Sequence, residues 1–158
     1  MKNTILLTLL IFPLAHSSVL ARPSCEGALS IEYKGIQKLK AWNKENSFGS
    51  FDLSNKSHKD IKIPLDSTDY PAIVHGRSIK VQSQQNASDT TWELDRVVLE
   101  EFRPPGKWII IAPGNGARIF VDIADPISDS EWSNSREYRV VLKDVLGCEY
   151  VSPPFHVN

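Results

Sequence analysis

The sequence has little of several features that point to particular classes of protein. Of its 158 residues only two are cysteine and one is methionine, and the formal net charge is −1 at pH 7. Such a chain has no broad positive field to hold a phosphate backbone, so we expect no nucleic-acid partner. No apolar run reaches the roughly 20 residues of a spanning helix, so we expect no membrane span. With 41% hydrophobic and 23% charged residues, the composition is nevertheless that of a folded globular domain.

Residues 1–21 have the pattern of an export signal. One basic residue, Lys2, is followed by the apolar run 5–12 and by a small-residue end at Ala21. This order is typical of a signal peptide, and its apolar stretch is about half as long as a spanning helix needs. We therefore expect cleavage after Ala21, a single mature domain of residues 22–158, and a secreted or periplasmic location.

The two cysteines lie near the two ends of this mature domain. Cys25 follows the expected cleavage point closely, and Cys148 lies near the C-terminus. Export places both thiols in an oxidising compartment, where disulfides form and persist. We expect a Cys25–Cys148 disulfide that ties the N-terminal segment to the last strands. Free or metal-binding thiols, the alternative, would need reducing conditions or clustered His and Cys ligands.

Short alternating segments separated by turn residues favour an all-β fold. Ten prolines and eight glycines provide many turns. Between them apolar and polar residues alternate, which is the period-2 pattern of strands with one buried face. The main segments of this kind are 29–33, 51–53, 61–65, 73–74, 79–81, 92–99, 119–123, 138–142 and 148–151. We expect a single antiparallel β-sandwich of about eight or nine strands.

Local patterns refine this outline. Residues 50–54 and 61–65 are expected to pair as a hairpin across a polar stretch. Residues 36–42 have an apolar side chain at every third position, which allows either a continued strand or a short helix. Residues 108–112 are apolar on both phases, so we expect a central strand that is covered on both faces or partly by a loop. Residues 113–116, Pro-Gly-Asn-Gly, predict a turn.

Four short motifs follow one another over residues 47–158. They are Phe51-x-Leu53-x-Asn55, Pro113-Gly114 before Ile119-x-Val121-x-Ile123, Tyr138-Arg139-Val140, and Ser152-Pro153-Pro154-Phe155. Together they resemble the immunoglobulin-like domains of exported bacterial proteins. The resemblance implies a sandwich architecture, and because such folds serve binding, scaffold and chaperone roles, it implies no particular activity. A weaker similarity is to the N-terminal domain of periplasmic pilus chaperones, which also carry a proline-glycine turn before a strand.

No sequence motif indicates catalysis or a cofactor. The Gly-x-Ser-x-Gly elbow of hydrolases does not occur. The histidines of the mature domain are far apart, and His58, His75 and His156 are all expected at solvated loop or strand-end positions. The stretch 114–116 leads into a strand rather than a helix, so it is expected to be a turn and not a phosphate site. A non-enzymatic role is favoured, and no cofactor is expected.

The densest acidic group is a weak candidate for calcium. Its members are Asp122, Asp125, Asp129 and Glu131. Carboxylates in a loop can surround a calcium ion, but this group lacks the Asp-x-Asp-x-Asp-Gly spacing of a dedicated site. Asp122 also alternates as an outward strand residue. We therefore expect no metal site.

The four tryptophans differ in their sequence context. Trp92 and Trp108 lie in apolar segments and are expected in the core, while Trp42 is left unassigned. Trp132 lies in a polar loop, so we expect an exposed ring and name it as the candidate for partner binding. The alternative is that Trp132 caps one end of the core.

Two glycosylation sequons also occur, relevant only in a eukaryotic host. They are Asn55-Lys56-Ser57 and Asn86-Ala87-Ser88.

These observations favour an exported, non-enzymatic binding or accessory module that meets a protein or glycan partner through its loops or strand edges. One alternative is an enzyme or enzyme inhibitor that acts through loop residues. Another is a structural envelope or surface-assembly subunit, for which an unpaired, uncharged edge strand would be the sign.

Overall fold

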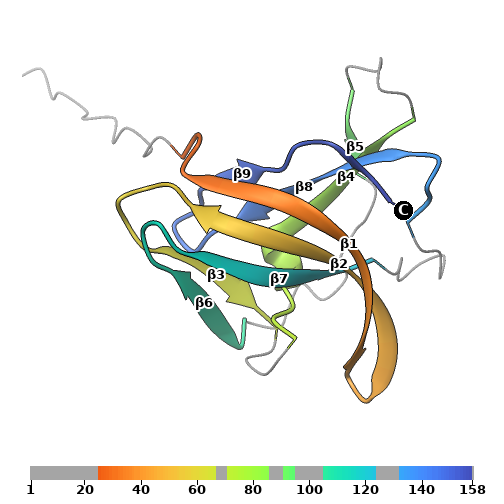
Figure 1. Cartoon of the computed structure of the whole chain (residues 1–158), viewed down its shortest axis with the longest axis horizontal. Helices are drawn as coiled ribbons and strands as arrows, with labels where there is room; N and C mark the ends of the chain where they lie inside the picture. Colours follow the sequence, from red (N-terminus) through yellow and green to blue (C-terminus); the bar gives the residue numbers. More distant parts are fainter. Residues whose placement is uncertain (1–24, 67–70, 86–90, 95–104, 124–131, 158) are drawn as a thin grey trace, which may run out of the picture.

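The computed structural model describes residues 25–66, 71–85, 91–94, 105–123 and 132–157. These residues form ten strands and one short 3-10 helix, and they contain no α-helix. The expected all-β class is therefore confirmed. The strands form several antiparallel sheets around a shared core, in the manner of a β-sandwich (Figure 1).

The first sheet has the strand order β1-β2-β7. Its strands are β1 (Leu29–Ala41), β2 (Lys44–Asn55) and β7 (Gly116–Asp122). Both pairs are antiparallel, so alternate side chains point into the core. The buried inward residues include Leu29, Ile31, Phe51, Leu53, Ile119 and Val121.

The opposite sheet is centred on β8. Its path is β10-β8-β4-β5, and β9 also pairs with β8. The strands are β4 (Ile79–Gln84), β5 (Glu93–Leu94), β8 (Glu137–Lys143), β9 (Glu149–Val151) and β10 (Phe155–His156). The prolines after Ser152 separate β9 from β10. Ser152 bridges this break, because its backbone N–H donates to the Val140 carbonyl and its hydroxyl accepts from the Val140 N–H.

A third, two-stranded sheet lies beside the first. It pairs β3 (Ile61–Leu65) with β6 (Lys107–Ile111). The residues before the helix η1 (Gly76–Ser78) connect it to the first sheet, since Val74 bridges to Leu65 and donates its N–H to the Phe120 carbonyl in β7. The segment 73–74 therefore makes isolated bridges, whereas 79–81 belongs to β4.

The predicted hairpin between residues 50–54 and 61–65 is wrong. β2 pairs with β1 and β7, and β3 pairs with β6. The chain leaves one sheet after Asn55 and enters another at Ile61. Alternation in two neighbouring segments showed that both are strands, but it carried no information about their partners.

Residues 36–41 continue β1, which settles the choice between strand and helix. The pairing register with β2 shifts between Tyr33 and Ile36. Ile36 packs against the main core, whereas Leu39 packs against a second cluster. This second cluster consists of Ala41, Phe48, Ile73 and Phe120. The three-residue spacing therefore reflects two apolar faces of one bent strand.

The expectation that residues 108–112 form a covered central strand is also wrong. Among the described strands, β6 pairs only with β3. Ile111 is buried, but Trp108 and Ile110 are 53% and 58% exposed. Trp108 is therefore not a core residue, and none of the described strands covers the outer face of this edge strand.

The expected Cys25–Cys148 disulfide is confirmed, with its half-cystines 123 residues apart in the sequence. Cross-linking so long a loop stabilises the fold by at most about 5 kcal/mol in chain-entropy models. Asp144 holds the turn that presents Cys148, because its Oδ1 accepts from the Cys148 N–H at 2.9 Å. Its Oδ2 accepts from the Tyr150 hydroxyl at 3.0 Å. Burial and this hydrogen bond raise the pKa of Tyr150 well above its usual value.

The expectation of an exposed Trp132 is wrong, since this residue is 8% exposed and belongs to the main core. Its ring stacks on Tyr138 with centroids 5.3 Å apart and lies 5.7 Å from Phe155. Gly49 makes this position available: a Cβ there would lie 2.9 Å from Trp132 Cζ3. The ring packs directly on the backbone of β2, which its polar sequence neighbours gave no reason to expect.

Gly49→Ala should therefore lower the free energy of unfolding by roughly 1 to 3 kcal/mol, the usual cost of overpacking a core. Denaturant unfolding measures this loss. In a Trp132→Leu background the same change should cost at least about 1 kcal/mol less, because the nearer of the two rings that face the new methyl group is gone, while Phe51 Cε2 at 3.1 Å remains. An undiminished cost in that background would show that the contact with Trp132 is not the reason for the glycine.

Candidate functional site

The acidic residues named as a weak calcium candidate are only partly within the described structure. Asp122 is half-buried at the end of β7. Asp125, Asp129 and Glu131 lie outside the described residues. Among the described residues, no group of three or more His, Cys, Asp or Glu is placed to hold a metal ion. The described part of the chain also contains no helix long and apolar enough to cross a membrane.

The three histidines have different environments. His58 and His156 are exposed, as expected. His75 lies at a strand end, as expected, directly after the bridge residues 73–74, but it is buried rather than solvated. Its Nδ1 accepts from the Arg77 N–H at 3.3 Å and caps η1, while its Nε2 lies 3.8 Å from Asp66 Oδ1. This arrangement gives His75 a structural role at a turn.

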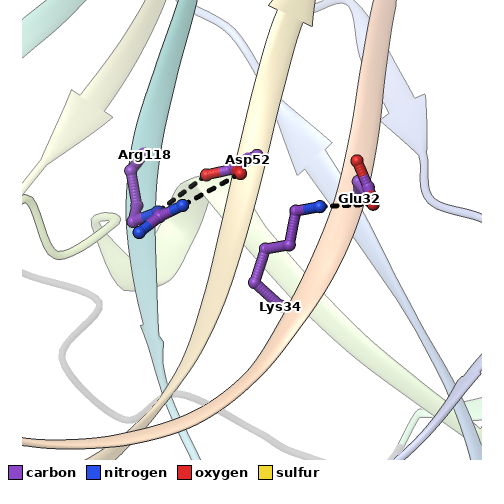
Figure 2. A network of polar contacts seen from close by, with 4 residues as sticks. All are labelled: Glu32, Lys34, Asp52 and Arg118. Carbon is purple, nitrogen blue, oxygen red and sulfur yellow. Dashed lines mark hydrogen bonds and ion pairs between the residues drawn. The ribbon is translucent and has the colours of Figure 1, made fainter.

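A network of charged residues covers the outer face of the first sheet (Figure 2). Arg118 donates from Nε and Nη2 to the two carboxylate oxygens of Asp52, at 2.7 and 3.0 Å. Lys34 pairs with Glu32, which stands directly opposite Asp52 in the strand register. The hydrogen bond from Arg118, followed by the charges of Arg118 and Lys34, holds the pKa of Asp52 below its usual value. The cations thus offset two facing carboxylates on a solvated sheet face.

Neither sequon offers a described glycosylation site. The side chain of Asn55 is fully buried, and its Nδ2 donates to the carbonyls of Lys59 and Ile111 at 2.7 Å each. An amide nitrogen held in this way is not open to modification. Asn86 lies outside the described residues.

Trp92 is half-buried rather than a full core residue. The guanidinium carbon of Arg139 lies 4.3 Å from its ring centroid, within the range of a cation–π contact. Arg139 also donates from Nε to Gln82 Oε1 at 2.7 Å. The ring and the cation therefore cover each other on the outer face of the second sheet.

The far end of the β1–β2 hairpin extends beyond the first sheet. β7 pairs with β2 only from Phe48 to Ser54. Residues 38–47 therefore form a two-stranded ribbon whose ladder partners are each other. Figure 1 shows this ribbon curving away from the sheets at the lower right. We call it the hairpin ribbon.

The turn at the end of the hairpin ribbon has an unusual residue in it. Trp42 and Asn43 are the two turn residues, with φ angles of 51° and 65°. Two successive positive φ values are typical of a type I′ hairpin turn, in which asparagine and glycine are favoured. A bulky side chain in the left-handed region is an outlier that costs of order 1 to 3 kcal/mol. Such strain is found most often at functional positions.

The Trp42 side chain is partly supported and partly exposed. Its ring centroid lies 5.9 Å from that of Phe48, which is buried. The residue is nevertheless 49% exposed. Asn46 steadies the turn by donating from Nδ2 to the Ala41 carbonyl at 3.1 Å. The ribbon thus presents a large aromatic surface on a buttressed base.

Exposed lysines lie on both strands of the ribbon that leads to this ring. The exposed lysines of the ribbon are Lys38, Lys40 and Lys44, and its single acidic residue is Glu45. No ion pair involves these lysines within the described structure. The ribbon therefore carries an excess of positive charge, although the whole chain has a formal net charge of −1.

The role of Trp42 was not predicted from the sequence. The available signal was Asn43 between two runs of alternating residues, which is a hairpin signature. The tryptophan beside it obscured that signature, because aromatic residues normally mark strands rather than turns.

Comparison with known families found no family model that matches this chain, and no curated protein matches it either. The resemblance to immunoglobulin-like domains therefore stays a prediction.

Proposed function

We propose that the protein is an exported, non-enzymatic binding module whose contact surface is the tip of the hairpin ribbon. The observation that carries this proposal is the half-exposed Trp42 ring in a left-handed turn residue. A residue that raises the energy of its own turn and exposes apolar surface is poorly chosen for stability alone. Contact with a partner would account for both the strained turn and the exposed ring.

The core of the domain holds the tip of the hairpin ribbon in a fixed position. The base of the ribbon rests on Phe48 and Phe120, which are both fully buried. The Cys25–Cys148 disulfide restrains the other end of the domain. A preformed turn loses little conformational entropy on binding, and tryptophan buries much area with few rotatable bonds. Tryptophan is for this reason common among residues that dominate interface energies.

The shape of the tip favours binding over catalysis. Substrate sites are usually concave, so that they can surround a small molecule and exclude water. The ribbon ends instead in a two-residue turn that exposes the Trp42 ring, with exposed lysines on both strands that lead to it. Such a tip suits insertion into, or docking on, a larger partner.

Trp42→Asn separates binding from stability. Because asparagine is favoured in this turn, the free energy of unfolding should stay unchanged or rise by up to about 1 kcal/mol. Capture of partners from the host envelope by the immobilised, disulfide-bonded protein should fall at least tenfold. Trp108→Ala, which removes the exposed ring of β6, is the matched control and should capture as wild type does.

Equal capture by wild type and Trp42→Asn would contradict the proposed contact surface. A loss of capture accompanied by an unfolded circular dichroism spectrum would contradict the claim that the ring is not needed for stability.

The alternative of a surface-assembly subunit is favoured by β6. This strand pairs only with β3 among the described strands, and Lys107 is its one charged residue. Trp108 and Ile110 expose their side chains on its outer face. An apolar strand at a sheet edge can add a strand from a second molecule.

If β6 serves assembly, sedimentation velocity should show dimers whose fraction rises with protein concentration. Ile110→Lys should abolish them, since a charge on an edge strand opposes pairing. A monomer at every concentration would eliminate this alternative and leave the hairpin proposal unaffected.

A further inference from the structure

We infer that the tip of the hairpin ribbon binds a surface of anionic phospholipid, with Trp42 at the depth of the headgroups and its lysines on the phosphates. This inference rests on the proposed function and names the partner's chemistry. It follows from the placement of charge, from the shape of the tip and from the chemistry of tryptophan.

The lysines lie on both faces of the ribbon. Lys38 and Lys40 are two residues apart on β1 and therefore share one face. Lys44 begins β2 and pairs with Ala41, which places it on the other face. Glu45 stands opposite Lys40 and shares the face of Lys38 and Lys40, so an excess of positive charge remains on each face of the ribbon. A ribbon that meets a plane end-on would bring all three ammonium groups near that plane, together with Trp42.

A membrane surface matches this combination. Tryptophan is enriched at membrane interfaces because its ring is apolar while its indole N–H is polar. Lysine side chains extend their stems along apolar surface and keep the ammonium group among the headgroups. A lipid surface can deform around a single convex ring. A glycan, by contrast, is usually held by a flatter aromatic platform with hydrogen-bonding groups beside it.

The number of lysines determines the affinity that we expect for an anionic lipid surface. Each lysine near an anionic lipid surface contributes roughly a fivefold gain in affinity, and salt screens this gain within a Debye length of about 8 to 10 Å. One ring and three lysines therefore predict weak, reversible and salt-sensitive binding. The excess positive charge of the ribbon is local, because the formal net charge of the chain is −1.

Co-sedimentation with vesicles tests the inference. The exported, disulfide-bonded protein is mixed with phosphatidylcholine vesicles, with or without about one third phosphatidylglycerol. We expect binding only to the anionic vesicles. The variant K38Q/K40Q/K44Q should bind them roughly 100-fold more weakly, and added salt should have a similar effect.

The matched control is K56Q/K59Q/K62Q, which removes the same charge from exposed positions at and beyond the opposite end of β2. It should bind within about threefold of wild type, because distant charges are screened. Lipids with brominated acyl chains should quench part of the wild-type tryptophan fluorescence. Trp42→Asn should lose that quenching while its circular dichroism stays native.

An equal loss of vesicle binding in both triple variants would overturn the inference. Binding would then depend on the net charge of the protein and not on the lysines of the ribbon. Absence of wild-type binding to anionic vesicles would overturn it as well. If vesicles are not bound but Trp42-dependent capture of a protein or acidic polysaccharide persists, only the lipid assignment fails. If Trp42→Asn changes neither vesicle binding nor capture, the proposed function fails too.

Discussion

The buried side-chain amide of Asn55 fixes the point at which the chain passes from one sheet to the next. Its nitrogen donates to the carbonyls of Lys59 and Ile111, and its oxygen accepts from the N–H and hydroxyl of Ser57. Loss of this amide would remove a buried hydrogen bond to the Ile111 carbonyl, at about 1 to 3 kcal/mol, whereas the Lys59 carbonyl would keep the Ser57 hydroxyl as a donor. The bonds hold the end of β2 beside the end of β6, and the backbone of Asn55 also bonds to Asn115 ahead of β7. With this end of β2 fixed, the opposite end extends past β7 and carries the hairpin ribbon outward.

Stability and binding are separated along the same two strands. Near Asn55, β2 is surrounded by core residues, and Gly49 allows Trp132 to pack on its backbone. Among the described residues, the ribbon beyond Phe48 is supported by the second, smaller cluster. The domain can therefore tolerate an unfavourable residue in the turn at the tip of the hairpin ribbon. In this account Trp42 is kept for its exposed ring, and the rest of the domain compensates for the strain.

Local patterns predicted what depends on local physics. Alternation located the strands around 119–123 and 138–142, and export with a single pair of cysteines predicted the disulfide. Pairing partners depend on contacts distant in sequence, so the expected hairpin of 50–54 with 61–65 was wrong. Burial of Trp132 depends on Gly49, far away in the chain, and exposure of Trp108 depends on the position of β6, which pairs only with β3 among the described strands. The candidate site was not predicted because Trp42 occupies a turn position that favours asparagine or glycine.

The central claim is that the hairpin ribbon is the part of this protein that meets its partner. Site-specific photo-crosslinking in exporting cells tests it most directly, with the crosslinker placed at Glu45 beside the tip or at Ser133, an exposed position far from it in sequence. The account predicts crosslinked products from position 45, lost on Trp42→Asn, and none from position 133. Products from position 133 together with none from position 45 would contradict it.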